Sequence, residues 1–178
     1  MTGNTFAVKS QVLFAAHRDG VFRYLCRIVG QRDAPDLTQE VFLRVARSAV
    51  PETTTDGERA WVFRIARNVA LNHRRDTGRK PDTVELTEFM GQAAARPASQ
   101  ETFTAMREAI ERLQALDRDV FLLREVAGLS YDEIAISCDI TADAVRSRLH
   151  RARQQLRQTL QPLLNNGSTP FVRLYDTR

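Results

Sequence analysis

Residues 129–157, LSYDEIAISCDITADAVRSRLHRARQQLR, constrain the fold of this 178-residue chain more than any other segment. Two helical patterns are separated by a break of three or four residues around Cys138 and Asp139. The second pattern carries five arginines and no acidic residue after Asp143. Two short helices with a basic second helix are typical of a helix-turn-helix, whose second helix enters the DNA major groove. The segment therefore predicts a sequence-reading DNA-binding motif.

Local signals place the ends of both helices. Ser130 followed by Glu133 matches the capping box S-x-x-E, which predicts the start of the first helix. Thr141 is the expected N-cap of the second helix. The tight turn of such motifs commonly contains glycine, whereas this chain has Cys138-Asp139. Because Asp tolerates a left-handed backbone better than most residues, we expect the turn to form at modest cost.

The second helix predicts one buried face and one DNA-contacting face. Its apolar residues fall in a narrow stripe at 100° per residue, which we expect to pack inward. Arginines on both sides of the stripe can reach phosphates, while Arg146 and Ser147 are the predicted base readers and Asp143 can accept from cytosine. The alternative for the arginines is a solvated helix face without a ligand. The stripe is Val145, Leu149, Ala152 and Leu156, and the predicted DNA contacts are Thr141, Asp143, Arg146, Ser147, Arg148, His150 and Arg151.

The distribution of charge supports this reading better than its total. The formal net charge is only +4. Residues 106–162 carry nine basic and nine acidic side chains, but all the acids lie at or before Asp143 and five arginines follow it. A basic stripe within a neutral segment is the charge pattern expected of phosphate contact.

The remaining composition excludes several classes of protein. The two cysteines, Cys26 and Cys138, are far apart, with no CxxC and no histidine at ligand spacing, so we expect neither a metal site nor a disulfide. No apolar run approaches the ~18 residues of a membrane span. The start of the chain does not resemble a signal peptide, and we therefore expect a cytoplasmic protein.

Helical periodicity nearly everywhere predicts an all-α chain of two small helical domains joined by a flexible linker. In the first half, helices are expected to end before Gly30, to begin near Pro35 and to pass through Trp61. Turn formers in 51–57, PETTTDG, predict a loop. The predicted divisions are a first domain over 8–78, a linker over 79–103, a helix-turn-helix domain over 104–162 and a mobile tail over 163–178.

Three segments together resemble the extracytoplasmic-function sigma factors, which are small bacterial promoter-specificity subunits. GLSYDEIA and ITADAVRSRLHRARQQLR resemble the fourth conserved region of this family. RDAPDLTQEVFLRVAR resembles the second-region helix that docks on RNA polymerase, and WVFRIARNVALNHRR resembles the adjoining helix that engages the promoter −10 element. With the linker, the matched segments cover roughly residues 10–160, in the family's order and spacing.

The resemblance implies a role for each segment. It assigns the helix-turn-helix set to the −35 element and implies core RNA polymerase, promoter DNA and an anti-sigma factor as partners. It implies no cofactor, no metal, no small-molecule substrate and no membrane insertion. The implied polymerase-binding residues are Asp36, Leu37, Gln39, Glu40, Phe42 and Leu43. The implied −10 residues are Arg64, Arg67, Asn68, Arg74 and Arg75. Their spacing also gives a basic helix edge, which suits contact with the DNA backbone or with an unstacked strand.

The chain departs from the family pattern in the loop before Trp61. The family often has an aromatic residue there that helps to capture a flipped −10 base, whereas residues 51–60 are PETTTDGERA. The base preference of this loop is therefore not carried over. Trp61 is expected in the core more than as a stacking platform. Pro35 replaces a usual acidic residue, at a first-turn position where it should not break the helix.

Three alternatives compete with a sigma factor. A helix-turn-helix regulator would need an upstream receiver or ligand domain, and residues 1–80 show no alternating βα pattern. An enzyme is disfavoured by three scattered histidines, no Gly-rich phosphate loop and no nucleophile motif. A sigma-like adaptor that binds polymerase without promoter selectivity remains open because of the altered loop. We predict an alternative sigma factor that is not an enzyme.

Overall fold

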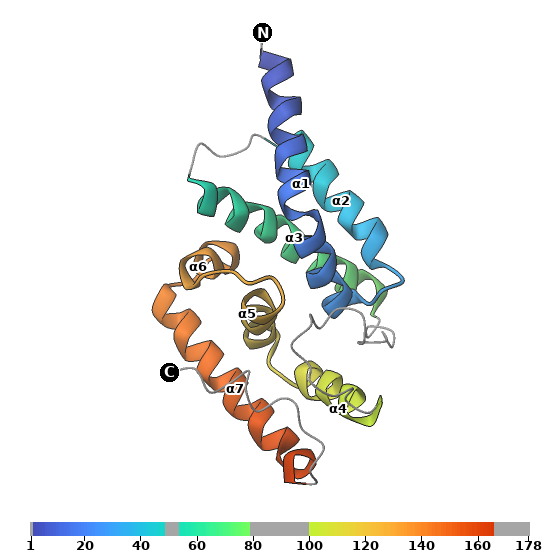
Figure 1. Ribbon diagram of the computed structural model, residues 1–178, viewed down its shortest axis with the longest axis vertical. Coiled ribbons are helices and arrows are strands. Elements are labelled where there is room, and N and C mark those ends of the chain that lie inside the picture. Colours follow the sequence, from blue (N-terminus) through green and yellow to red (C-terminus); the bar gives the residue numbers. More distant parts are fainter. Residues whose placement is uncertain (1, 49–53, 79–99, 166–178) are drawn as a thin grey trace. The chain divides into compact units, whose positions relative to one another are not determined.

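The computed structural model describes residues 2–48, 54–78 and 100–165, and every regular element in these ranges is an α-helix (Figure 1). The all-α prediction is confirmed. Residues 79–99 of the predicted linker and 166–178 of the predicted tail lie outside the described residues, whereas 100–103 and 163–165 are helical. The helices are α1 (Thr2–Val29), α2 (Ala34–Arg47), α3 (Thr55–Thr77), α4 (Gln100–Glu111), α5 (Ala115–Glu125), α6 (Tyr131–Cys138) and α7 (Ala142–Asn165).

The helices fall into two compact units. One unit contains α1, α2 and α3 together with the last turn of α5, α6 and the first turn of α7. The other contains α4, the first part of α5 and the rest of α7. The domain boundaries expected from the sequence stay a prediction. No helix in the described residues is long and apolar enough to cross a membrane.

Glycine ends α1 as predicted. Gly30 has φ of +94°, and its N–H donates to the Cys26 carbonyl at 3.2 Å. Only glycine adopts this left-handed conformation without a Cβ penalty, so it stops the helix and turns the chain toward α2. Leu25 and Val29, on the last two turns of α1, are buried.

The start of α2 also follows the prediction. Pro35 lies in the first turn, where a backbone N–H has no partner within the helix, so the ring is accommodated. Val41 and Val45 are fully buried, while Leu37 is half-buried. The buried Thr38 hydroxyl donates to the Ala34 carbonyl at 2.7 Å and is thereby satisfied inside the helix.

The loop predicted over 51–57 is wrong at its C-terminal end. α3 begins at Thr55, because the Thr54 side chain accepts from the Gly57 N–H at 3.3 Å and caps the helix. Asp56 and Glu58 in the first turn suit the positive end of the helix dipole. These threonines and acids indicate a turn when read alone, but they are also the residues that start helices.

The first unit has a continuous apolar core. α1 packs on α2 and α3, and α2 packs on α3. Tyr24 and Phe63 are both buried and meet edge to face with ring centroids 6.0 Å apart. An ion pair of 2.7 Å between Lys9 and Glu58 further joins α1 to α3. This packing gives α3 a fixed orientation against α1.

In the second unit α4 and α5 are separated by a short break that the sequence did not predict. Met106 and Leu113 are both buried, but α4 ends at Glu111, between them. Arg118, buried on α5, donates to the Glu111 carboxylate at 3.2 Å and approaches its carbonyl at 3.4 Å. This contact holds the two helices at their junction.

Candidate nucleic-acid interface

The start of α6 is fixed by the predicted capping box. The Glu133 N–H donates to the Ser130 hydroxyl at 3.1 Å, and the Ser130 N–H donates to the Glu133 carboxylate at 2.6 Å. Two of the N–H groups that a helix start leaves without intrahelical partners are satisfied in this way. The prediction for this end of the motif is confirmed.

The turn between α6 and α7 forms without glycine. Asp139 has φ of +57° and ψ of +50°, the left-handed conformation expected of this position. Its N–H donates to the Ala135 carbonyl, and the Thr141 hydroxyl accepts from the Ala144 N–H at 3.2 Å. Both the turn and the N-cap predictions are confirmed. The two helices therefore have the sharp connection that a helix-turn-helix requires.

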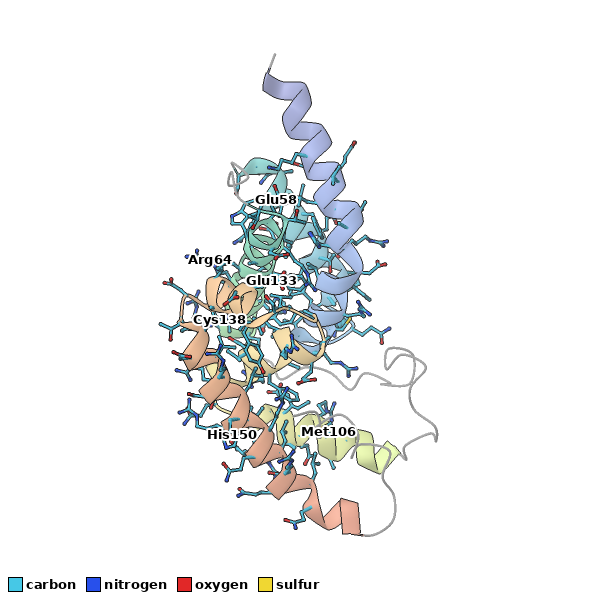
Figure 2. All side chains as sticks on the ribbon, turned by 60° about the vertical axis from the view of Figure 1, so that its left-hand side comes forward. Glu58, Arg64, Met106, Glu133, Cys138 and His150 are labelled. Carbon is cyan, nitrogen blue, oxygen red and sulfur yellow. The ribbon has the colours of Figure 1, made fainter. Side chains whose placement is uncertain are left out.

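α7 has the predicted division into a buried and an outward face. Val145, Leu149, Ala152 and Leu156 are all at most 1% exposed. The predicted outward positions on the opposite face, among them His150 (Figure 2), are exposed to solvent. The base-reading candidate Arg146 and Arg157, nearer the C-terminal end of α7, are exposed as well. The exposed outward residues are Asp143, Ser147, His150 and Gln154.

Two arginines of the predicted DNA set bind a carboxylate of the same chain. Asp117, in the first turn of α5, is 5% exposed and accepts from Arg148 at 2.8 Å and Arg151 at 3.3 Å. The side chain of Arg148 is 25% exposed and that of Arg151 is 57% exposed. Asp117 thus fixes α7 against α5 within the second unit. Sequence reasoning missed Asp117, whose pattern is that of an ordinary first-turn acid.

The predicted −10 residues lie along one helix. Arg64, Asn68 and Arg75 are exposed on α3, while Arg67 and Arg74 are half-buried; Figure 2 labels Arg64. Arg67 and Asn68 lie three and four residues after Arg64, and Arg74 and Arg75 follow them two turns later, so these positions share one edge of the helix.

Neighbouring contacts hold this end of α3 in place. His73 lies 2.9 Å from the Asp33 carboxylate, which ties α3 to the connection between α1 and α2. Arg75 donates to the Asn72 side chain at 2.7 Å. Trp61 is half-buried and does not belong to the fully buried core of the first unit.

The predicted polymerase-binding residues lie on α2 with unequal exposure. Asp36, Gln39 and the 41%-exposed Leu43 face solvent. Leu37 and Glu40 are half-buried, and Glu40 accepts from Arg44 at 2.7 Å. The exposed members leave α2 with a mixed acidic, polar and apolar outer face.

Phe42 is the exception in this set. It is 8% exposed and meets Phe14 of α1 edge to face at 4.9 Å between ring centroids. Phe14 is itself 43% exposed, with the Arg18 guanidinium 5.8 Å from its ring centroid. The aromatic surface next to α2 is therefore provided by Phe14, which sequence reasoning did not single out.

Among the described residues, no group of histidine, cysteine or acidic side chains could hold a metal ion. Cys26 and Cys138 are both buried thiols without a disulfide. Burial raises the pKa of the Cys26 thiol above its ordinary value, which keeps it protonated at neutral pH.

Comparison with known proteins agrees with this geometry. The family model for sigma-70 region 2 matches residues 13–80, and the model for sigma-70 region 4 matches residues 103–156. The chain is 30% identical over 166 residues to the ECF RNA polymerase sigma-E factor of Escherichia coli, covering 86% of this chain and 87% of that protein. The chain belongs to the sigma-70 family, among its extracytoplasmic-function sigma factors. Members of this family are transcription initiation factors and not enzymes.

Further relatives are consistent with this assignment. The chain is 35% identical over 167 residues to the ECF RNA polymerase sigma factor SigE of Mycolicibacterium smegmatis, covering 89% of this chain and 65% of that protein. The fold is similar to that of CnrH, solved with the cytosolic domain of CnrY, at TM-score 0.65 and 22% identity, covering 86% of this chain and 88% of that one. It is also similar to the sigma factor RpoE of Bartonella quintana, solved with the anti-sigma factor NepR, at TM-score 0.62 and 20% identity, covering 85% and 96%.

Proposed function

We propose that this sigma factor binds core RNA polymerase through α2 and reads two promoter elements, −10 with α3 and −35 with α7. The observation that carries the proposal is the helix-turn-helix itself. A left-handed Asp139 and two capped helices present an α7 whose apolar stripe is buried and whose polar residues face outward. Polymerase would supply the catalysis, and the chain would supply the position of initiation.

At the −35 element, the N-terminal part of α7 would lie in the major groove. Arg146 and Ser147 would read base edges, Asp143 would accept from cytosine, and Thr141 and His150 would lie beside the backbone. Arg148 and Arg151 would contribute from the helix flank while Asp117 orients them. Arg151, the more exposed of the two, is the better placed for a phosphate.

At the −10 element, the basic edge of α3 would bind the DNA backbone or the unstacked strand. The exposed Arg64, Asn68 and Arg75 support this role, with Arg67 and Arg74 beside them. The aromatic-free segment 51–60 would adjoin the −10 base.

On α2, the exposed Asp36, Gln39 and Leu43 would contact polymerase directly, together with Leu37 and Glu40. Phe42 would support this surface from below, through its contact with Phe14. We propose that the protein acts in the cytoplasm, where RNA polymerase acts, and its membership of this family supports that location. We also propose an anti-sigma factor as a regulatory partner. We propose that the sigma factor itself needs no cofactor.

Reconstituted transcription tests the central proposal. Adding the purified chain to core polymerase should redirect initiation to a defined subset of promoters, and mutating either promoter element should abolish that initiation. A chain that binds core polymerase without redirecting initiation would instead be a polymerase adaptor. A chain that does neither would contradict the proposal.

The role of Arg146 has its own test. Arg146→Ala in the holoenzyme should weaken promoter binding by about 1–3 kcal/mol, and only for promoters carrying the base that Arg146 reads. Arg157→Ala, an exposed arginine three turns further along α7, is the matched control and should cause no base-specific change. An equal loss on every −35 sequence, with a shallower salt dependence, would make Arg146 a phosphate contact.

A further inference from the structure

The buried carboxylate of Asp117, on α5, is shared by two arginines of α7. Its Oδ1 atom accepts from Arg148 at 2.8 Å and from Arg151 at 3.3 Å. The arginines are three residues apart, so both lie on the flank of α7 that faces the first turn of α5. Asp117 is only 5% exposed, so its charge is compensated by these arginines more than by water. We call these three residues the Asp117 cluster.

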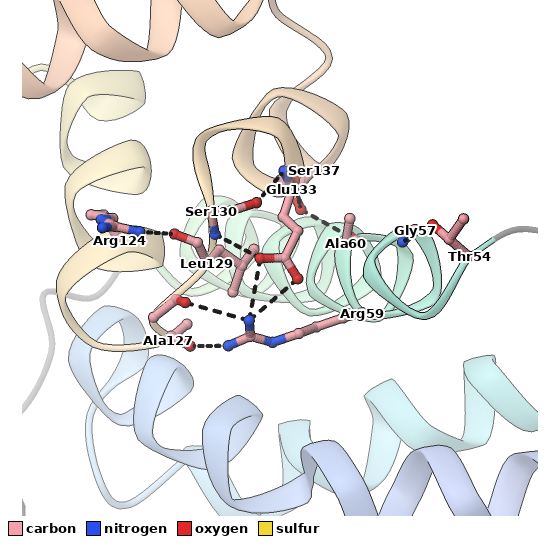
Figure 3. Close-up of polar contacts among 11 residues, drawn as sticks. Thr54, Gly57, Arg59, Ala60, Arg124, Ala127, Leu129, Ser130, Glu133 and Ser137 are labelled. Carbon is pink, nitrogen blue, oxygen red and sulfur yellow. Dashed lines mark hydrogen bonds and ion pairs between the residues drawn. The ribbon is translucent and has the colours of Figure 1, made fainter.

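The charges of the Asp117 cluster do not balance. Two guanidinium groups meet one carboxylate, which leaves one positive charge in surplus. The buried Glu133 differs, because its carboxylate meets the single guanidinium of Arg59 and also accepts from the Ser130 backbone N–H (Figure 3). A further anion would add excess negative charge at Glu133, whereas it would neutralise the surplus of the Asp117 cluster. The Asp117 cluster is therefore suited to binding an anion.

Arg151 is the arginine that can bind this anion. A guanidinium has five N–H donors, and the bond from Arg151 to Asp117 uses one of them. The side chain of Arg151 is 57% exposed, against 25% for Arg148, whose Nε atom is buried. Arg151 can therefore donate to a second anion while Asp117 still holds it. Arg148, with the shorter bond, keeps Asp117 in place.

We propose that Asp117 is a positioning residue for −35 recognition. It holds Arg151 in one direction, so that Arg151 meets a phosphate of the DNA backbone where α7 is seated in the matching register. Phosphodiester oxygens accept from a guanidinium as a carboxylate does, and the duplex brings them beside a helix that lies in the major groove. The inference rests on the proposed function of α7 as the −35 reader and adds the acid that directs one of its arginines.

A fixed Arg151 affects matched and unmatched DNA differently. On a matched −35 element the base contacts seat α7, and the phosphate then lies where Arg151 already points. On unmatched DNA α7 lies in other registers, so Arg151 must leave Asp117 to reach a phosphate. Breaking an ion pair of this exposure weakens binding by a factor of about 1.4–5. Because phosphate contacts supply nearly all of the affinity for unmatched DNA, Asp117 increases the discrimination between the two.

Binding of the full chain to a duplex without promoter elements tests this positioning. Asp117→Asn should bind that duplex about 1.4–5-fold more tightly, because Arg151 is released to any phosphate within reach. The slope of log affinity against log salt concentration should steepen by up to about 0.9, since one more phosphate is neutralised. Fluorescence anisotropy measures both quantities. Glu108→Gln is the matched control: it removes the same charge from an ion pair with Arg112, outside α7, and should leave the slope unchanged.

The Arg151→Ala background separates positioning from a general effect on the fold. In that background Asp117→Asn should no longer tighten binding to the promoterless duplex, because the arginine that it releases is absent. Tighter binding that persists without Arg151 would overturn the proposal. So would an Asp117→Asn chain that circular dichroism shows to be folded and that binds the duplex no more tightly than the unsubstituted chain.

Nuclear magnetic resonance of arginine side chains gives a test without any change at Asp117. The guanidinium signals of Arg148 and Arg151 are assigned by their loss in Arg148→Lys and Arg151→Lys. Adding the promoterless duplex to the full chain should shift the Arg151 signal and leave the Arg148 signal in place. A shift of both signals, or of neither, would contradict the proposed division between the two arginines.

Reconstituted holoenzyme measures the consequence for specificity. Asp117→Asn should lower the ratio of binding between a promoter with an intact −35 element and the same promoter with that element scrambled by about 1.4–5-fold. The change should come mainly from tighter binding to the scrambled promoter, and an unchanged ratio would refute the role in discrimination. If the unsubstituted chain redirects initiation to no promoter, the proposed function fails, while the duplex and resonance measurements still decide whether Asp117 restrains Arg151.

Discussion

The buried carboxylate of Asp117 provides a quantitative test of how α7 is held. Asp117→Asn keeps the volume of the side chain and removes its charge. The pair with Arg151, whose side chain is 57% exposed, should contribute only about 0.2–1 kcal/mol. The bond from Arg148, 25% exposed, to the 5%-exposed Asp117 is charge-assisted and should contribute about 1.5–3 kcal/mol. We therefore expect the free energy of unfolding to fall by about 2–4 kcal/mol.

Urea denaturation at neutral pH, followed by circular dichroism, measures this loss. Glu108→Gln is the matched control, since its ion pair with Arg112 spans 3.6 Å between side chains that are both more than half exposed. It should change stability by less than about 0.5 kcal/mol. A double-mutant cycle of Asp117→Asn with Arg148→Met should give a coupling energy of about 1–2 kcal/mol. If Asp117→Asn is as mild as the control, the carboxylate does not hold α7 and the argument fails.

Three further predictions concern the motif and its surroundings. Asp139→Gly should alter the free energy of unfolding by less than about 0.5 kcal/mol, because relief of the left-handed backbone and the added entropy of the unfolded glycine nearly cancel. Asp139→Val should instead lower it by about 1–2 kcal/mol in thermal unfolding, because a β-branched residue is strained in that conformation. A valine that leaves stability unchanged would exclude strain at this turn. Ser130→Ala should lower the unfolding free energy by about 1 kcal/mol in urea titration, and no loss would show that the cap is dispensable. Burial, together with the Arg59 charge, lowers the pKa of His17. The unfolded chain therefore binds more protons than the folded chain as the pH falls below about 6.5, and stability is lost there. His17→Gln should flatten the dependence of the unfolding free energy on pH between about 7.5 and 5.5, and an unchanged slope would contradict this.

Local patterns sufficed for the helix-turn-helix. The capping box at Ser130, the left-handed Asp139 and the Thr141 cap each depend on residues within four positions of one another, and all three form as predicted. The inward stripe of α7 is equally local, since helical periodicity alone sets which side chains share a face. These features could be read without knowing what packs against them.

The features that sequence reasoning missed depend on residues far apart in the chain. Asp117 meets Arg148 across 31 positions, and Arg59 meets Glu133 across 74. Glu133 has the correct residue type for a capping box whether or not Arg59 approaches it, so the pattern contains no sign of the second role. The start of α3 at Thr55 was missed for a local reason. The residues there form turns as readily as they cap helices, so the pattern alone favours a loop.

Asp117 also changes how the basic character of α7 should be counted. Five arginines follow Asp143 in the sequence, but two of them already bind a carboxylate within the chain. Neutralising fewer phosphates releases fewer counterions, so α7 alone should bind DNA weakly and with a shallow salt dependence. A weak reader becomes effective when a second site on the same body holds the DNA nearby, because the tether replaces bulk concentration by a high local one. Under the proposed function, modest charge on α7 would make −35 recognition conditional on polymerase and the −10 element, and would favour promoters carrying both elements over isolated −35 sequences.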